Sequence, residues 1–188
     1  VPETVSRRRI APIVVLVVAA VLGGLFWVLA GSKAENDTSG AIDSHLLGEP
    51  APSVRSTTLD DEPFDLARRK GSWVVLNFFT HNCVPCVREH PELIEFVDQQ
   101  RALGTDGAEF YTIVRDSNRD EVEAFFTERG GDWPIVYDPR YEFANDFGVA
   151  LVPETWIIDD NGVVRRRLIS EVTAESLGSL IQQLRAQG

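Results

Sequence analysis

Runs of apolar residues alternate with amphipathic stretches along residues 46–188, and this pattern predicts strands and helices in turn. "WVVLNFF" at 73–79 is a continuous β-branched and aromatic run, as in a strand that is buried on both faces of a sheet. A second run of this kind, "AEFYTIV", occupies 108–114. Between the two runs we predict a helix over 83–103. Its inner stripe consists of Val87, Leu93, Ile94 and Val97.

The remaining segments predict a hairpin near each end of the domain and further helices between and after them. Residues 53–72 alternate weakly around an Asp-Asp-Glu turn, and 154–170 hold two apolar runs around Asn161-Gly162, a strong hairpin signal. The other predicted elements are helices at 118–131, 140–149 and 173–187, the last capped by Thr173, and a strand at 134–138. Alternating strands and helices predict an α/β fold with helices on both faces of a parallel sheet, to which the final hairpin adds antiparallel strands.

The N-terminus carries an uncharged run, residues 10–31, directly after three arginines at 7–9. As a helix, this run would span roughly 33 Å, which is enough to cross the hydrocarbon core of a bilayer. Because positive charge stays on the cytoplasmic side, we expect 1–9 in the cytoplasm and 10–31 as a transmembrane anchor. The alternative is a cleaved signal peptide with "VLA" at 28–30 as the processing site.

The small, polar residues 32–45 are typical of a flexible linker, and the folded domain is expected over 46–188. Both interpretations of the N-terminus place these residues outside the cytoplasm. We therefore expect a single-pass protein of the cell membrane with an extracytoplasmic C-terminal domain. The formal net charge is −11. An acidic domain repels nucleic-acid phosphates, so no nucleic-acid partner is expected.

The chain has only two cysteines, Cys83 and Cys86, separated by two residues. A structural disulfide over so short a loop would stabilise the fold little. Covalent haem requires a histidine directly after the second cysteine, where this chain has Val87. Zinc would need His81 and His90 as further ligands, but they approach from opposite ends of the motif, so no metal site is expected. Both histidines are expected to flank the motif in solvent, where His81 could tune a thiolate.

Thiol–disulfide exchange explains the cysteine pair best, because Cys-x-x-Cys beside a βαβ pattern is a dithiol motif. Cys83 is predicted at the N-terminus of a helix, where unpaired N–H groups and the helix dipole stabilise a thiolate. Only the thiolate attacks, so Cys83 is the expected nucleophile. Cys86 lies one turn further in and would resolve the mixed disulfide. Pro85 stiffens the loop between them.

The chain resembles the thioredoxin superfamily, and within it the membrane-anchored TlpA/ResA/CcmG-like branch, over about residues 46–187. "VVLNFFTHNCVPCVREHPEL" is similar to the strand and active-site helix of that branch, with Pro91 where the family kinks the helix. "GVALVPETWIIDDNGVV" resembles the family's segment around its cis-proline, and 104–147 resemble its inserted strand-helix segment. The departure is Asn82, where the family usually has tryptophan. This change bears on substrate recognition and redox potential, not on the thiol chemistry.

The resemblance implies a thioredoxin-like fold and further site residues. Glu89 stands where the family has an acidic residue that handles protons beneath the disulfide; the alternative is a solvated helix glutamate. Val152-Pro153 would form a loop with a cis bond that packs on the disulfide and offers backbone hydrogen bonds to an extended substrate. The alternative is a trans proline in an ordinary turn. Asn82 and Pro85 are the further expected substrate contacts.

We therefore expect a thiol–disulfide oxidoreductase that reduces partner disulfides through a redox-active Cys83–Cys86 pair, without a cofactor. Apocytochrome c is the client that the resemblance implies. A membrane electron donor and the lipid bilayer are the other expected partners, and the protein is expected to be a monomer. The alternatives are an oxidase or isomerase of secreted proteins, a metal or haem carrier, and a tethered binding module. A thiol peroxidase fits less well, because it needs a pocket around a single attacking cysteine.

Overall fold

The computed structural model describes residues 10–31, 44–116 and 118–187. The chain divides into two compact units, 1–38 and 39–188, and each is described by itself.

The first unit contains one described helix, α1 (Ile10–Gly31), in which the described side chains are those of 14–24. Within the described part of the chain, no helix is long and apolar enough to cross a membrane. The expected cytoplasmic segment, 1–9, and most of the expected linker, 32–45, lie outside the described residues. The assignment of 10–31 to a membrane anchor therefore stays a prediction.

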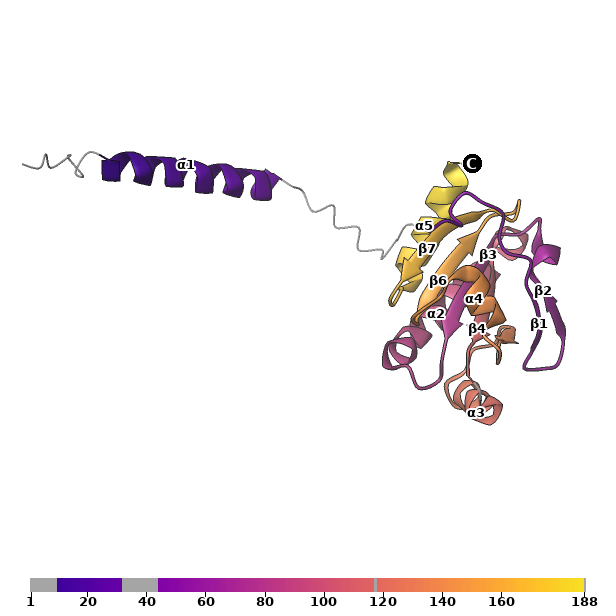
Figure 1. Ribbon diagram of the computed structural model, residues 1–188. Helices are drawn as coiled ribbons and strands as arrows, with labels where there is room; N and C mark the ends of the chain where they lie inside the picture. Colours follow the sequence, from indigo (N-terminus) through magenta and orange to yellow (C-terminus); the bar gives the residue numbers. More distant parts are fainter. Residues whose placement is uncertain (1–9, 32–43, 117, 188) are drawn as a thin grey trace, which may run out of the picture. The chain divides into compact units, whose positions relative to one another are not determined.

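In the described part of the second unit, seven strands form one mixed sheet in the order β2-β1-β5-β4-β3-β6-β7 (Figure 1). The strands are β1 (Arg55–Thr58), β2 (Pro63–Asp65), β3 (Val74–Phe79), β4 (Glu109–Val114), β5 (Ile135–Tyr137), β6 (Glu154–Ile158) and β7 (Val164–Ile169). β4 pairs in parallel with both β3 and β5, and the other neighbouring pairs are antiparallel. The two predicted hairpins are confirmed as β1–β2 and β6–β7.

Helices cover both faces of the sheet, as the alternating pattern predicts. They are α2 (Val84–Ala102), α3 (Arg119–Arg129), α4 (Glu142–Phe147) and α5 (Ala174–Ala186), with the short 3-10 turns η1 (Leu66–Arg69) and η2 (Gly104–Asp106). Helices α2, α3 and α5 contribute to the apolar core on one face, here called the α2 face, and α4 and η1 to the core on the other, the α4 face. The predicted cap is confirmed, since the Thr173 hydroxyl accepts a hydrogen bond from the Ser176 N–H at 3.2 Å.

Side chains alternate between the two faces of the sheet along β3, so every second residue of this strand points toward α2. All six residues of β3 are buried. Val75 and Phe79 belong to the core of the α2 face, whereas Val74, Leu76 and Phe78 belong to that of the α4 face. Asn77 shares the parity of Val75 and Phe79, so it brings an amide to the α2 face. On β6 the same rule sends Glu154 and Thr155 to opposite faces.

Two expectations about the helical segments need correction. His90 is buried on α2, with its ring centroid 5.0 Å from that of Phe125 and 5.6 Å from that of Trp133, so it is not solvated. Helix α3 and the loop after it bring these aromatic rings over the histidine. Residues 104–147, expected as an insertion, include β4, which is the middle strand of the sheet, so part of this segment belongs to the centre of the fold.

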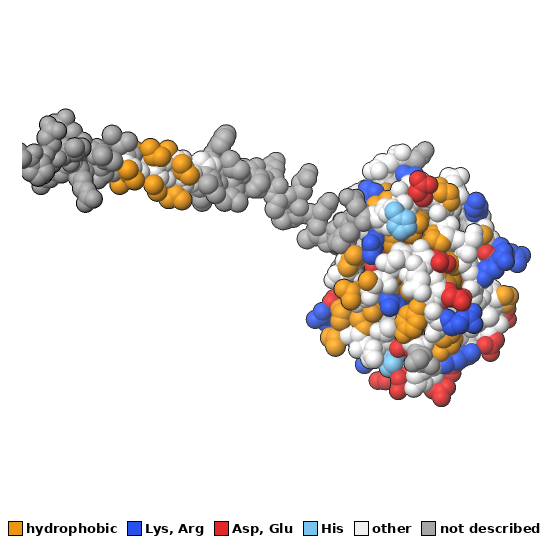
Figure 2. Space-filling model, in the orientation of Figure 1, with side chains coloured by type: hydrophobic (Ala, Val, Ile, Leu, Met, Phe, Trp, Pro, Cys, Tyr) orange, Lys and Arg blue, Asp and Glu red, His pale blue; other side chains and the backbone are white. Residues whose placement is uncertain are grey.

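The surface of the second unit carries both signs of charge, interspersed rather than gathered into one large patch on the face shown in Figure 2. Exposed apolar side chains are few in the described part of this unit, and two of them, Val84 and Leu151, are close in sequence to the cysteine pair and to Pro153. An interspersed surface of this kind favours solubility and leaves such apolar side chains as candidate contacts for a partner.

Candidate functional site

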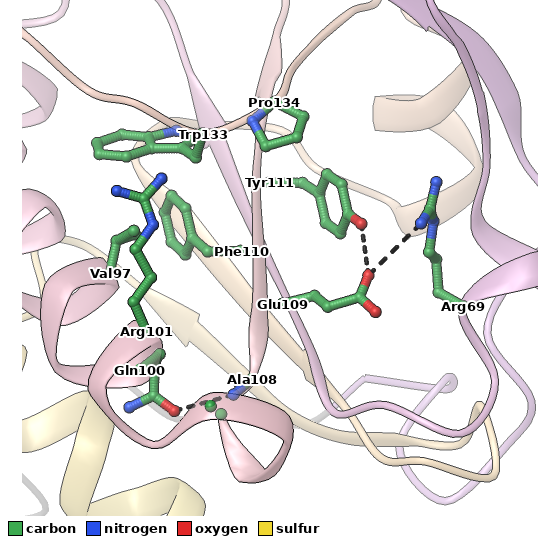
Figure 3. A pocket seen from close by; sticks show the side chains of 12 residues that line it. Arg69, Val97, Gln100, Arg101, Ala108, Glu109, Phe110, Tyr111, Trp133 and Pro134 are labelled. Atoms are coloured by element: carbon green, nitrogen blue, oxygen red, sulfur yellow. Dashed lines mark hydrogen bonds and ion pairs between the residues drawn. The ribbon is translucent and has the colours of Figure 1, made fainter.

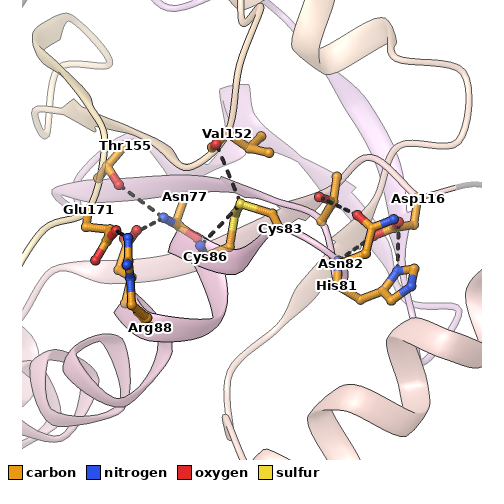
Figure 4. The surroundings of a disulfide bond; sticks show 12 residues. Asn77, His81, Asn82, Cys83, Cys86, Arg88, Asp116, Val152, Thr155 and Glu171 are labelled. Atoms are coloured by element: carbon orange, nitrogen blue, oxygen red, sulfur yellow. Dashed lines mark hydrogen bonds and ion pairs between the residues drawn. A yellow bond between two sulfur atoms is a disulfide. The ribbon is translucent and has the colours of Figure 1, made fainter.

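Cys83 and Cys86 form a disulfide at the start of α2, directly after β3. Cys83 is the N-cap of the helix, and the Cys86 N–H donates a hydrogen bond to its sulfur at 3.2 Å (Figure 4). Cys83 is half-buried, whereas Cys86 is only 1% exposed. The predicted asymmetry is therefore present: an accessible sulfur in the field of a helix N-terminus, and an inner sulfur one turn below it.

The loop before β6 faces the disulfide. The Val152-Pro153 peptide bond is cis, as expected. The Val152 carbonyl oxygen lies 3.6 Å from the Cys83 sulfur, which confirms the expected contact (Figure 4). Val152 is half-buried and Pro153 is buried. When Cys83 is a protonated thiol, this carbonyl is its nearest hydrogen-bond acceptor among the contacts described.

Glu89 is buried beneath the disulfide end of α2, at 1% exposure, so the alternative of a solvated glutamate is wrong. Its Oε1 accepts a hydrogen bond at 3.0 Å from the Asn77 amide, whose nitrogen also donates to the Thr155 hydroxyl at 3.1 Å. Burial, reinforced by the negative charge of Glu171 and opposed by the Asn77 hydrogen bond, raises the pKa of Glu89 from 4.5 to about 8.

Asn77 and Thr155 are not among the site residues predicted from the sequence. Asn77 is the one side chain with hydrogen-bonding groups besides the Trp73 indole in the run "WVVLNFF". A buried amide needs a partner, and this interruption of an apolar strand was the available signal. Thr155 gave a weaker signal, because threonine is common in strands.

The two remaining expected substrate residues lie on the outer side of the cysteine pair. Asn82 is exposed, and its side-chain oxygen lies 3.3 Å from the Thr80 hydroxyl. Pro85 is half-buried in the first turn of α2. Val84 and Leu151 extend this rim with side chains that are 68% and 72% exposed.

His81 links the loop before Cys83 to the segment after β4 and to α3. Its Nδ1 lies 2.8 Å from Asp116 Oδ1, its backbone N–H donates to Asp116 Oδ2 at 3.0 Å, and its Nε2 lies 3.0 Å from Glu121. The His81 side chain is 22% exposed, so it flanks the site as expected but is less solvated. Asp116 and Glu121 are not among the predicted residues, because they approach His81 only when β4 and α3 are packed beside it.

No group of three or more histidine, cysteine or acidic side chains among the described residues is arranged to hold a metal ion. A cavity of about 340 Å³ opens elsewhere, between the end of α2 and β4, lined among others by Arg69, Arg101, Tyr111 and Trp133 (Figure 3). The lining includes neither cysteine nor the loop at Val152. Of the two cysteines, only Cys83 is partly exposed, and Cys86 lies buried beneath it.

The fold, the helix-capping disulfide and the facing cis-proline loop place the chain in the thioredoxin superfamily. Residues 46–180 match the family described as Redoxin, and the chain belongs to this family. It is 32% identical to the thiol:disulfide interchange protein HelX of Rhodobacter capsulatus over 174 residues, 91% of this chain and 92% of HelX. It is 28% identical to the thiol-disulfide oxidoreductase ResA of Bacillus thuringiensis over 138 residues, 73% of this chain and 78% of ResA.

Solved structures agree with the sequence relatives. A DsbF homologue from Corynebacterium diphtheriae superposes with a TM-score of 0.66 and 27% identity, over 78% of this chain and 94% of the other. Together with the Cys83–Cys86 disulfide, these relatives show that the chain is a thiol–disulfide oxidoreductase.

Proposed function

We propose that this protein reduces the disulfides of partner proteins outside the cytoplasm, with Cys83 as the attacking and Cys86 as the resolving thiol. The Cys83 thiolate attacks one sulfur of the partner disulfide, forms a mixed disulfide and releases the other partner sulfur as a thiolate. Cys86, once deprotonated, attacks the Cys83 sulfur, and the second partner thiolate leaves. Two electrons pass to the partner, and the Cys83–Cys86 disulfide remains for a membrane electron donor to reduce.

The observation that carries this proposal is the difference between the two sulfurs. The Cys86 N–H hydrogen bond and the start of α2 stabilise a thiolate on Cys83, the more accessible cysteine. Cys86 is buried and is bonded to Cys83. The loop at Val152-Pro153 would align an extended partner segment beside Cys83, with Asn82 and Pro85 as further contacts. Glu89 would serve as the proton-handling group below the pair.

The location and the client are also part of the proposal. The uncharged run at 10–31 and the arginines at 7–9 support an anchor with 1–9 in the cytoplasm, 32–45 as a linker and the domain beyond the membrane. Tethering would keep the domain near its electron donor and raise their effective concentration. Resistance of the full chain to extraction by alkaline carbonate tests the anchor; release by that wash would contradict it.

A client with two closely spaced cysteines suits this chemistry, because both must be reduced before a group such as haem can attach to them. Apocytochrome c is such a client, and the resemblance to the TlpA/ResA/CcmG-like branch supports it. We propose that the protein acts as a monomer on this client. Loss of the gene should lower holocytochrome c, and added thiol should partly restore it; unchanged holocytochrome c would contradict the client.

The roles of the two cysteines are tested by trapping. The full chain should reduce insulin in the presence of dithiothreitol, and both Cys83→Ser and Cys86→Ser should lose this activity. Cys86→Ser should accumulate mixed disulfides with partner proteins through Cys83, whereas Cys83→Ser should not. Adducts that form through Cys86 instead, or a wild-type chain that does not reduce insulin, would overturn the proposal.

A further inference from the structure

Two buried oxygen atoms beneath α2 lack a hydrogen-bond partner, and both belong to the same pair of side chains. They are Oδ1 of Asn77 and Oε2 of Glu89. The other atoms of the pair are engaged: the Asn77 amide nitrogen donates to Glu89 Oε1 and to Thr155 Oγ1. Two unpartnered acceptors cannot satisfy each other. One proton on Glu89 Oε2 converts it into a donor and gives Asn77 Oδ1 a group to accept from.

We propose that Asn77 is a positioning residue that lets Glu89 gain and lose a proton in place, because its amide offers a partner to both states of the carboxyl group. In the carboxylate, the amide N–H stabilises the charge on Oε1. In the carboxylic acid, the same bond remains and Oε2–H donates to the amide oxygen. The inference rests on the proposed function, in which a proton must reach and leave Cys86.

The sheet register holds the amide in place. Asn77 lies directly opposite Thr155 on β6 and directly opposite Thr112 on β4. The Thr155 hydroxyl occupies one amide hydrogen, so the other stays directed at Glu89. Glu89 and Cys86 lie three residues apart on α2, and both are buried, which puts them on the same side of the helix.

The charged groups described near Glu89 do not supply a counter-charge to its carboxylate. Glu171, in the segment before α5, raises the pKa of Glu89 through its negative charge, and it is itself ion-paired with the exposed Arg88. The hydrogen bonds described from β3 and β6 come from neutral side chains, those of Asn77 and Thr155 (Figure 4). The Asn77 hydrogen bond is therefore the one local interaction among them that favours the carboxylate, and it opposes the effect of burial.

This arrangement gives a balanced proton step when the Cys83–Cys86 disulfide is reduced. A donor thiolate attacks the Cys83 sulfur, the S–S bond breaks, and Cys86 leaves as a thiolate. Glu89 gives its proton to that thiolate and becomes a carboxylate, which Asn77 stabilises until solvent reprotonates it. In the opposite direction, the carboxylate takes the proton of the Cys86 thiol as Cys86 attacks the mixed disulfide.

The test is the titration of Glu89 in the full-length oxidised protein, followed by carbon-13 NMR of glutamate carboxyl groups and assigned with Glu89→Gln. Asn77→Leu removes the amide without adding charge. It should raise the Glu89 midpoint by up to about one pH unit, because the carboxylate loses a charge-assisted hydrogen bond, while the carboxylic acid loses only weaker, neutral ones. The pH optimum for resolving the mixed disulfide should rise by a similar amount.

Thr112→Val is the matched control. Thr112 is buried next to Asn77 and accepts a hydrogen bond from the Trp133 indole at 2.8 Å, so its loss should lower the melting temperature. The Glu89 midpoint should stay within a few tenths of a pH unit of wild type, since Thr112 has no contact with the carboxyl group among those described. A midpoint that shifts equally in Asn77→Leu and Thr112→Val, or in neither, would overturn the inference.

Asn77→Asp keeps the inference testable if the leucine variant does not fold. A second carboxyl group at this position should share one proton with Glu89, so that the first ionisation and the last are separated by several pH units. A single, unshifted midpoint would contradict the pairing. Insulin reduction by the wild-type chain tests the proposed function separately, because it does not depend on where Glu89 titrates.

Discussion

The two faces of the sheet each bury one glutamate, and the two carboxyl groups differ in their partners. Glu89 on the α2 face and Glu154 on the α4 face are both 1% exposed. Glu154 pairs with both Arg167 Nε, at 2.9 Å, and Arg167 Nη2, at 3.0 Å, and accepts from the Trp156 indole at 2.7 Å. Glu89 has one neutral donor, Asn77. Two equally buried carboxyl groups therefore differ in their contacts: Glu154 has a guanidinium counter-charge, and Glu89 has only a neutral amide among the partners described.

Strand geometry produces this difference. Trp156 lies opposite Arg167 in the β6–β7 register, so the guanidinium shares a face with Trp156 and reaches diagonally to Glu154. Thr155, between Glu154 and Trp156, points to the α2 face and meets Asn77. The Arg167–Glu154 ion pair stabilises the sheet, whereas the neutral side chains of Asn77 and Thr155 lie beside Glu89. Three predictions test this division.

The largest expected effect is the pH dependence contributed by Glu89. Between pH 4.5 and about 8 the unfolded chain has lost this proton while the folded protein keeps it, so stability falls as pH rises. Over this interval the loss is about 5 kcal/mol. Urea unfolding of oxidised protein at several pH values should show it in wild type and not in Glu89→Gln. The exposed Glu95→Gln, on the same helix, should follow wild type; a Glu89→Gln curve parallel to wild type would contradict the prediction.

Arg167→Leu should destabilise the protein by about 3–5 kcal/mol, because it leaves the Glu154 carboxylate buried without its counter-charge. Unfolding in urea at neutral pH measures the change. The double variant Arg167→Leu with Glu154→Gln should recover much of the stability. Activity per folded molecule should stay close to wild type, since neither residue contacts the cysteines in the described structure. A loss below about 1 kcal/mol would show that the pair is not structural.

The smallest expected effect concerns the edge of the site, where His81 is half-buried. Asp116→Ala removes two hydrogen-bond partners of His81 and should lower stability by about 1–2 kcal/mol. Glu121→Ala removes the contact between a more exposed carboxylate and His81 Nε2 and should cost less than about 0.5 kcal/mol. Thermal unfolding compares the two variants. Equal losses of stability in the two variants would contradict the prediction that the buried Asp116 contributes more than the exposed Glu121.

Apolar pattern was enough to predict the elements of this fold, because a run such as "WVVLNFF" is stable only between two covered faces. The cysteine roles followed from the position of Cys83 at a helix start. The Asn77–Glu89 pair was not predictable in the same way, because it requires the register of β3 and the docking of α2 together. His90 was placed wrongly for the same reason: its aromatic neighbours come from α3 and the following loop.

The reduction potential of the Cys83–Cys86 couple tests the central claim, that this oxidoreductase donates electrons to its partners. The full chain should be equilibrated with glutathione buffers, and its thiols then trapped by alkylation. A reductant should have a potential well below about −180 mV and nearer the thioredoxin value of about −270 mV. A potential near about −120 mV, typical of a strong oxidant, would contradict the account and reverse the direction of electron flow.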